Sequence, residues 1–364
     1  MNILFQLSHP AHFHLYKQTI HNLIERGHNI HILIKTKDIL EDLIKEAGLP
    51  YQNILPVAHR KSKLGILWDM IVRDWRIFNY TRDNKIDILI GSTVEIAQVG
   101  WILRKPRINF GEDDIAIIPL FQKLGGPYID TFLAPTTCDM GKLESKTIHY
   151  PGFHKLAYLH PNLFKPDRAV VEKYFASDRP YFLLRFAELN AYHDTHASGL
   201  NTDIAQRLIE ILKPYGDIYI TSERALEPQF EQYRLQINPL DIHHIMAFAK
   251  IYIGDSQSMA VEAAMLGTPS IRFNTFAGKI GVLEELQEVY KLTIGIHSSR
   301  PEMLYEVVKT WLNMPNLNEQ FIQRRDRLMA DKIDVTAFFT WFIENYPKSK
   351  KDNEKLQHLT QYFR

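Results

Sequence analysis

Residues 251–273 read IYIGDSQSMAVEAAMLGTPSIRF: an apolar run, a polar turn, a small-residue apolar segment and a second apolar run. The spacing predicts a strand that ends at Gly254, a turn over 255–258, and a helix that begins near Met259 and stops at the Gly-Thr-Pro sequence. A strand, a helix and a strand in direct succession are the unit of a parallel sheet. This stretch therefore predicts an open α/β domain.

The polar turn also has the chemistry of an anion site. The first turn of a helix presents backbone N–H groups without intrahelical acceptors, and these favour a pyrophosphate. Glu262 follows one turn later, where its carboxylate could accept two hydroxyls of a ribose. Asp and Ser are also good N-cap residues, so an ordinary helix cap is the alternative. We expect the site to be lined by Asp255, Ser256, Gln257 and Ser258.

The rest of the second half continues the alternation of strands and helices. The runs YFLLRFA and DIYITSE predict two further strands with a helix between them. Arg185, Thr221 and Ser222 then lie at strand ends, and ligands of open parallel sheets bind at that edge. A guanidinium there could bind a diphosphate through a bidentate fork. A surface ion pair is the alternative for Arg185.

The first half of the chain shows the same rhythm and predicts a second parallel sheet. A length of 364 residues suits two domains, and right-handed crossovers would make each sheet doubly wound. A proline-containing stretch after TIHYPG breaks the rhythm and indicates an interdomain connection. We expect domains at 1–160 and 161–335, followed by a helical tail at 336–364. The strands expected in the first domain are NILFQL, HNIHILIK, YQNILPV, IDILIGS, RINFGE, TFLAP and TIHYPG.

A histidine-rich loop follows the first of these strands and reads SHPAHFH. Pro10 suits the first helical position, so Ser8 or His9 would cap the helix and His12 would lie in its first turn. Histidine titrates near neutrality, which suits a general base that takes a proton from a hydroxyl, and His9 and His12 are our candidates. His14 is expected to pack. A plain polar turn is the alternative; we expect no metal because the chain lacks HExxH, CxxC and Asp-x-Asp patterns.

An acidic run, INFGEDD, follows another predicted strand. Glu112 and Asp113 are candidates for orienting a substrate or transferring a proton, with Asp114 beside them. Glu95 follows the strand before it. Solvated loops and helix caps are the alternatives for all of these carboxylates.

Composition narrows the class of protein. The net charge of +1 provides no global field for nucleic acid, and the single Cys138 fits a reducing compartment. The start of the chain has no basic segment typical of a signal peptide, and no apolar run approaches the roughly 18 residues of a spanning helix. We therefore expect a cytoplasmic protein.

A basic run, HRKSK, precedes a long amphipathic helix that carries Trp68 and Trp75. Its cations are His59, Arg60, Lys61 and Lys63. This combination could hold a phosphorylated or lipid-linked acceptor at the inner face of a membrane. The alternative is a helix that packs on its sheet with both tryptophans in the core.

The segment GDSQSMAVEAAMLGTP resembles the nucleotide-sugar motif of the GT-B glycosyltransferase superfamily and is similar to that of the non-hydrolysing UDP-N-acetylglucosamine 2-epimerases. Glu262, Gly267 and Pro269 match that motif. More closely, most of the chain resembles the family DUF354, found in bacterial and archaeal surface-polysaccharide contexts, most strongly at 1–30 and 240–275. The acidic run departs from the epimerases, which have a histidine-valine-glutamate-alanine-glycine sequence where this chain has FGEDD.

The resemblance implies a GT-B-like fold with two Rossmann-like domains facing across a cleft. It implies a glycosyltransferase-like enzyme of polysaccharide or glycoconjugate biosynthesis whose substrate is a nucleoside-diphosphate sugar, with no further cofactor. The second domain would bind that sugar through Arg185, the turn 255–258 and Glu262. A carbohydrate or lipid-linked acceptor would enter from the first domain, where His12 or Glu112 would activate its hydroxyl. One alternative is a sugar-nucleotide 2-epimerase that uses two or more carboxylates, which Glu95, Glu112 and Asp113 could supply. The other is a non-catalytic sugar-nucleotide-binding protein.

Overall fold

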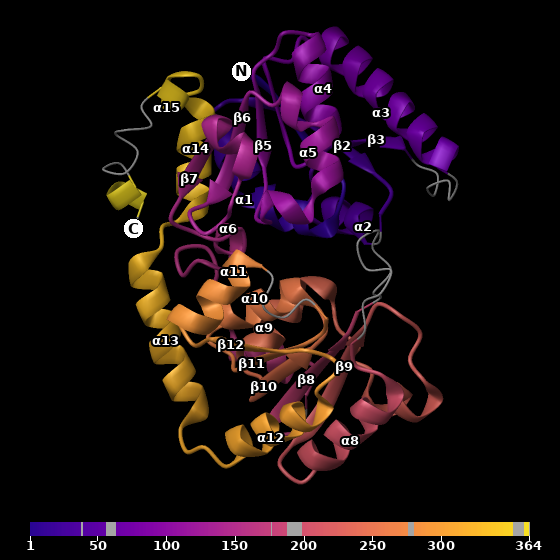
Figure 1. Cartoon of the computed structure of the whole chain (residues 1–364), viewed down its shortest axis with the longest axis vertical. Helices are drawn as coiled ribbons and strands as arrows, with labels where there is room; N and C mark the ends of the chain where they lie inside the picture. Colours follow the sequence, from indigo (N-terminus) through magenta and orange to yellow (C-terminus); the bar gives the residue numbers. More distant parts are fainter. Residues whose placement is uncertain are drawn as a thin grey trace. The chain divides into compact units, whose positions relative to one another are not determined.

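The chain forms two compact units, each built on its own parallel sheet (Figure 1). Unit 1 comprises Met1–His160 and Lys332–Arg364, and unit 2 comprises Pro161–Asp331. The predicted tail at 336–364 thus belongs to unit 1. The computed structural model describes residues 1–37, 39–55, 63–175, 177–187, 199–275, 280–351 and 360–363.

Unit 1 has a seven-stranded sheet with the order β3-β2-β1-β4-β5-β6-β7, in which every neighbouring pair is parallel. The chain begins on an interior strand, β1, and extends the sheet to both sides of it, so the sheet is doubly wound as predicted. All seven predicted strands are present: β1 (Asn2–Leu7), β2 (Asn29–Lys35), β3 (Gln52–Leu55), β4 (Ile88–Gly91), β5 (Arg107–Phe110), β6 (Thr131–Pro135) and β7 (Thr147–Tyr150).

Helices cover this sheet and close its core. One hydrophobic cluster joins strand residues to α3 and α4: Leu4, Leu33, Ile54, Ile77, Ile86, Leu89, Ile96 and Val99. The helices are α1 (Pro10–Glu25), α2 (Leu40–Glu46), α3 (Lys63–Asp83), α4 (Val94–Ile102), α5 (Pro119–Leu124), α6 (Leu156–Leu159), α14 (Val335–Glu344) and α15 (Lys348–Lys351). Short 3-10 turns occupy Ile115–Ile117, Gly126–Tyr128, Gly141–Lys146 and Thr360–Phe363.

The C-terminal helix α14 completes the core of unit 1. It contacts α1 and α6, and the Phe339 ring lies 4.7 Å from Phe110 and 5.2 Å from Tyr150. All three rings are almost fully buried. Residues from the end of the chain therefore pack on strands β5 and β7 of its first half.

Unit 2 has a five-stranded parallel sheet with the order β12-β11-β10-β8-β9. Its strands are β8 (Tyr181–Phe186), β9 (Asp217–Ser222), β10 (Ile251–Gly254), β11 (Ser270–Phe273) and β12 (Thr293–Ile296). Its helices are α7 (Arg168–Glu172), α8 (Thr202–Leu212), α9 (Ile242–Ala247), α10 (Gln257–Leu266), α11 (Gly281–Glu284), α12 (Pro301–Leu312) and α13 (Leu317–Asp331). Shorter turns lie at Pro228–Tyr233, Pro239–Asp241 and Glu285–Val289.

Helix α10 has the boundaries that its sequence favours. Ser256 is the N-cap, and Gly267 ends the helix at φ 76°, a left-handed conformation that costs glycine no steric strain. Most of its side chains are buried because it carries small and apolar residues all round. The predicted strand–helix–strand unit of β10, α10 and β11 is confirmed.

The tryptophans of α3 are on the surface. Trp68 is 54% exposed and Trp75 is 65% exposed, so the alternative that placed them in the core is wrong. His59, Arg60 and Lys61 lie outside the described residues, as does the side chain of Lys63. Within the described ranges, no helix combines the length and apolar character needed to cross a membrane.

Candidate functional site

The carboxyl edge of the unit 1 sheet gathers several of the predicted residues. The histidine-rich loop follows β1, Glu112 follows β5, and His154 follows β7. Strands of a parallel sheet end at the same edge, so segments far apart in sequence meet there. This edge is the candidate site of unit 1.

His9, one of the two predicted caps, is the N-cap of helix α1. Its Nδ1 accepts the N–H of Ala11 at 3.1 Å, and Pro10 is the first helical residue. The His9 side chain is exposed. His14 packs against the ring of Tyr158 at 5.2 Å, which agrees with its expected packing role.

His12 presents a hydrogen-bond donor. The N–H of Ser8 lies 3.3 Å from His12 Nδ1, and the Ser8 hydroxyl lies at the same distance. A backbone N–H only donates, so Nδ1 holds a lone pair and the neutral ring carries its hydrogen on Nε2. Burial lowers the pKa of His12 to about 3, helped by the nearby charges of His9, His154 and Lys35. The ring is therefore neutral at pH 7, and its geometry favours a donor over the general base that we expected.

Glu112 is an ionised carboxylate in a tight network. Its Oε1 accepts the N–H of His154 at 2.6 Å, and its Oε2 pairs with Lys155 Nζ at 2.7 Å. Burial alone would raise the pKa of Glu112, but Lys155 and His154 outweigh it and the pKa is lowered. The Cys138 thiol donates to the Glu112 carbonyl at 3.2 Å.

His154 is a candidate that the sequence reasoning missed. Its Nδ1 lies 4.0 Å from Glu112 Oε2, and its Nε2 is buried without a hydrogen-bond partner among the described residues. A carboxylate on the Nδ1 side favours the tautomer with the lone pair on Nε2, which is the form of a general base. Burial, with a contribution from Lys155, lowers the pKa of His154 to about 4, so this form persists at neutral pH. The sequence signal for His154 was its position shortly after the predicted strand TIHYPG. We had interpreted that stretch as an interdomain connection.

The other predicted carboxylates of unit 1 have different environments. Asp113 is exposed, and Asp114 accepts the N–H of Asp139 at 2.8 Å. Glu95 is buried in an ion pair with Arg73 at 2.6 Å. Across the described residues, no group of three or more histidine, cysteine or acidic side chains is arranged to hold a metal ion.

In unit 2, the start of α10 follows β10 at the carboxyl edge of the sheet. Ser256 Oγ accepts the N–H of Met259 at 3.4 Å, which leaves the first-turn amides of Gln257 and Ser258 without intrahelical acceptors. The Ser258 side chain is exposed. The predicted helix start after β10 is therefore present.

Asp255 has a different environment from the one we expected. Its Oδ1 accepts the N–H of Ala187 at 2.6 Å, its Oδ2 accepts that of Leu200 at 3.3 Å, and the side chain is buried. Burial raises the pKa of Asp255 to about 6 despite these bonds. A Cβ on Gly199 would lie 2.5 Å from Oδ2, so glycine is required at this close approach. The carboxylate thus links Ala187, after β8, to Leu200, before α8, through hydrogen bonds. It does not line the anion site.

Arg185 and Thr221 are neighbours on adjacent strands. Arg185 is paired in register with Thr221 on β9 and with Gly254 on β10. Its Nη2 contacts Glu223, whereas its Nε and the Thr221 hydroxyl are buried without hydrogen-bond partners in the described part of the chain. Ser222 differs, because its hydroxyl donates to the Arg224 carbonyl at 2.7 Å and accepts the Arg224 N–H at 3.2 Å.

Glu262 lies in the second turn of α10 and forms a buried pair. Its Oε1 is 3.5 Å from His243 Nε2, on helix α9. The adjacent His244 accepts the N–H of Asp167 at 3.0 Å and packs on Phe164. The first of the two histidines therefore reaches the carboxylate that we assigned to a ribose.

The solved structures similar to this chain define its fold class. UDP-GlcNAc 2-epimerase from Neisseria meningitidis, bound to UDP-GlcNAc, is 14% identical with a TM-score of 0.68, over 94% of this chain and 100% of that one. Spinosyn rhamnosyltransferase SpnG, complexed with thymidine diphosphate, is 15% identical with a TM-score of 0.63, over 94% and 100%. A putative UDP-N-acetylglucosamine 2-epimerase from Listeria monocytogenes is 12% identical with a TM-score of 0.66, over 93% and 96%. The fold is therefore of the GT-B type, as predicted.

The family follows from the sequence itself. The chain belongs to the family described as "Protein of unknown function (DUF354)", whose model matches residues 1–287. The predicted family is thereby confirmed. No curated protein matches the chain.

Proposed function

We propose that the chain is a glycosyltransferase-like enzyme that binds a nucleoside-diphosphate sugar on unit 2. The observation that carries this proposal is the unpartnered pair Arg185 Nε and Thr221 Oγ1 at the sheet edge where α10 begins. Guanidinium, hydroxyl and helix N–H groups all donate hydrogen bonds that the oxygens of a diphosphate can accept. In the binding step, Ser256, Gln257 and Ser258 supply the helix start and Glu262 holds the ribose, with His243 behind it.

Unit 1 supplies the acid–base groups in this proposal. His154 Nε2 takes the proton of the acceptor hydroxyl, and Glu112 stabilises the imidazolium that forms, 4.0 Å from its Nδ1. His12 donates a hydrogen bond from Nε2 to the sugar or acceptor. Negative charge on the departing diphosphate is stabilised by Arg185 and the α10 amides.

Support for this reaction class also comes from the relatives of the fold, which bind UDP-GlcNAc or thymidine diphosphate. A carbohydrate or lipid-linked acceptor in surface polysaccharide or glycoconjugate synthesis fits the proposal. A 2-epimerase, which the notable similarity to epimerases also suggests, would need groups that remove and return a proton at the sugar. Of the carboxylates expected for it, Glu95 is tied to Arg73 and Asp113 is exposed, so we favour transfer.

Nucleotide binding is tested with Arg185→Ala. Calorimetry with a panel of UDP-, GDP-, CDP- and TDP-sugars should identify one nucleotide whose affinity falls about tenfold or more, because charge-assisted bonds contribute about 1.5–3 kcal/mol. Arg207→Ala is the matched control, since Arg207 also pairs with a glutamate but lies on the exposed face of α8. An equal loss in both variants, or no binding by the wild type, would contradict the proposal.

Reaction class is tested by incubating the chain with the bound nucleotide-sugar in deuterated water without acceptor. A transferase releases the nucleoside diphosphate slowly and leaves the sugar's configuration unchanged. An epimerase yields an inverted, deuterium-labelled sugar, and a binding protein leaves the substrate intact. Either of the last two results rejects the transferase assignment.

A further inference from the structure

A cavity of about 650 Å³ opens at the amino-terminal edge of the unit 1 sheet, the edge opposite the candidate site. It lies where α4 ends and β5 and β6 begin. Three cationic residues line it, Arg104, Lys105 and Arg107, together with Trp101 and Ile102. None of the residues proposed to act on a sugar nucleotide belongs to it.

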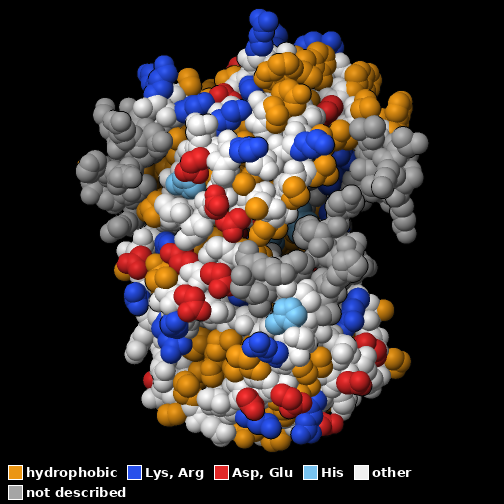
Figure 2. All heavy atoms as spheres, in the orientation of Figure 1, with side chains coloured by type: hydrophobic (Ala, Val, Ile, Leu, Met, Phe, Trp, Pro, Cys, Tyr) orange, Lys and Arg blue, Asp and Glu red, His pale blue; other side chains and the backbone are white. Residues whose placement is uncertain are grey.

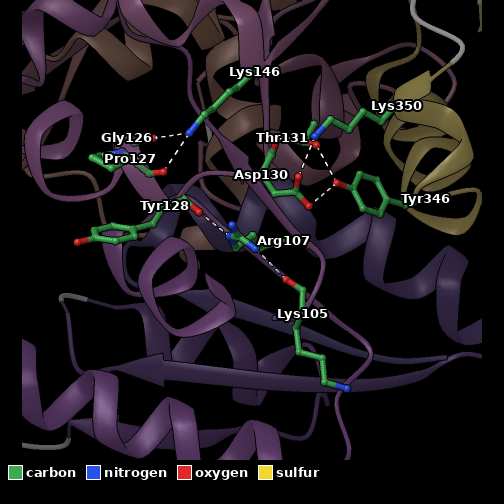
Figure 3. A network of polar contacts seen from close by, with 10 residues as sticks. All are labelled: Lys105, Arg107, Gly126, Pro127, Tyr128, Asp130, Thr131, Lys146, Tyr346 and Lys350. Atoms are coloured by element: carbon green, nitrogen blue, oxygen red, sulfur yellow. Dashed lines mark hydrogen bonds and ion pairs between the residues drawn. The ribbon is translucent and has the colours of Figure 1, made fainter. Parts of the chain in front are cut away.

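The one acidic side chain lining the cavity is already satisfied. Asp130 Oδ1 pairs with Lys350 Nζ at 2.8 Å, and Asp130 Oδ2 accepts the Tyr346 hydroxyl at 2.8 Å (Figure 3). Arg104 and Lys105 form no ion pair with the described residues. The cavity therefore holds uncompensated positive charge.

Arg107 is fixed in place with part of its guanidinium available. Its Nε donates to the Tyr128 carbonyl at 2.5 Å and its Nη1 to the Lys105 carbonyl at 3.1 Å, and no described residue accepts from Nη2 (Figure 3). Nearby, Lys146 Nζ donates to the carbonyls of Gly126 and Pro127, both at 3.1 Å. Burial lowers the pKa of Lys146, and the positive charge of Arg107 lowers it further. Cations that repel one another in this way are stabilised by a bound anion.

The rim of the cavity is apolar and exposed. Trp101 is 54% exposed and Ile102 is 57% exposed at the end of α4, and the indole lies 5.1 Å from the Tyr128 ring. Apolar side chains lie beside lysines and arginines over the part of unit 1 that α4 occupies (Figure 2). Tryptophan beside cations is typical of surfaces that contact the headgroup layer of a bilayer.

We propose that this cavity binds the phosphate group of an anionic membrane lipid. Arg104, Lys105 and Arg107 contact the phosphate oxygens, and Trp101 and Ile102 insert among the headgroups. The exposed apolar rim favours a lipid over a free phosphorylated metabolite, which would leave the indole in water. The proposal is independent of the sugar-nucleotide function, because the nucleotide is proposed to bind unit 2 and the acid–base groups of unit 1 lie at the opposite edge of its sheet.

The first test is co-sedimentation of the full chain with phosphatidylcholine vesicles that contain or lack phosphatidic acid. We expect binding only to the anionic vesicles, and an affinity about 10- to 30-fold lower for Arg104→Ala/Lys105→Ala, since each cation near an anionic surface contributes about 1 kcal/mol. The matched control is Lys213→Ala/Lys309→Ala, which removes the same charge from exposed positions of unit 2. Equal losses in both double variants, or no loss in either, would overturn the assignment of this cavity.

The second test separates the lipid from its phosphate. Trp101→Ala should weaken vesicle binding and leave the binding of inorganic pyrophosphate, followed by NMR, unchanged. Pyrophosphate binding that depends on Arg104 and Lys105 without any vesicle binding would show a soluble phosphate ligand and reject the lipid. Circular dichroism checks that each variant is folded. We expect folding because Trp101 and Arg104 are exposed and Lys105 forms no ion pair with the described residues.

Discussion

At His12, a single hydrogen bond determines which ring nitrogen can react. Ser8 N–H occupies Nδ1, so Nε2 carries the hydrogen. His154 has the opposite arrangement, since its Nδ1 faces Glu112 and its Nε2 has no partner among the described residues. The two neutral imidazoles lie at one edge of the sheet. His12 thus presents a hydrogen-bond donor at Nε2, and His154 presents a hydrogen-bond acceptor at Nε2.

The donor–acceptor assignment predicts unequal effects of substitution. His154→Gln should lower turnover by about 10²–10⁴-fold, the usual contribution of a general base, with nucleotide affinity unchanged. His12→Gln, which keeps an N–H donor, should retain more turnover than His12→Ala. His149→Gln, on the neighbouring strand β7, is the control. If both His12 variants are equally inactive and His154→Gln is active, the roles are reversed.

The same histidines predict how stability depends on pH. Their pKa values in the folded chain, about 3 for His12 and about 4 for His154, lie below the ordinary value of 6.5. Below pH 6.5 the unfolded chain therefore binds protons that the folded chain does not, and stability is lost as pH falls. From pH 7 to 5 we expect a loss of about 1–2 kcal/mol for each histidine, measured by urea unfolding. The slope should flatten in His12→Gln/His154→Gln; an unchanged slope would contradict these pKa values.

Local signals identified some of these residues and not others. The cap at His9 and the first helical position at Pro10 could be predicted because both depend on neighbours in sequence. The role of His154 could not, because its partner Glu112 is 42 positions away. Nor does the sequence show that the Asp255 carboxylate would be occupied by the amides of Ala187 and Leu200.

At the scale of elements, β11 carries a fully buried arginine between two glycines. Arg272 is in register with Gly254 on β10 and Gly295 on β12, and it is completely buried. A Cβ at Gly295 would lie 2.7 Å from Arg272 Nη2. The absence of a side chain at Gly295, on the neighbouring strand β12, thus leaves space for the guanidinium.

Gly295→Ala should therefore destabilise unit 2 by about 1–3 kcal/mol, the usual cost of overpacking. The measurement is the free energy of unfolding in urea. In an Arg272→Met background the same change should cost less, because the crowded guanidinium is gone. Equal costs in both backgrounds would show that Arg272 is not the residue that requires glycine.

Most strands could be predicted because each is a short apolar run that follows a turn signal. Strand β12 was missed because its sequence, TIGI, contains a threonine and a glycine among its four residues and its two inner positions are half-buried. Its identity as a strand depends on pairing with β11, which is a contact between elements. Helix α12, directly after it, was missed with it.

At the scale of the whole molecule, unit 1 is made from both ends of the chain. The alternation of strands and helices predicts the fold class, because it is a property of every segment. The return of Lys332–Arg364 to unit 1 could not be predicted, because apolar residues such as Phe338 and Phe339 do not show which core they fill.

This arrangement predicts a stability effect confined to unit 1. Phe339→Ala should cost about 3–5 kcal/mol, since it removes a fully buried ring packed on Phe110 and Tyr150. Hydrogen exchange should become faster in β5 and β7 and stay unchanged in the β8–β12 sheet. Met303→Ala, at an exposed position of α12, is the control. Faster exchange in both sheets would show that the units unfold together.

The position of α14 near the end of the chain has a consequence for folding during synthesis. A ribosome delivers all seven strands of the first sheet before it begins the second, yet the helix that covers Phe110 and Tyr150 emerges only after Asp331. Throughout that interval, the rings of Phe110 and Tyr150 lack the cover that α14 provides in the folded chain. Chaperones that bind such surfaces would have their longest opportunity here, and premature termination would leave the early sheet permanently uncovered.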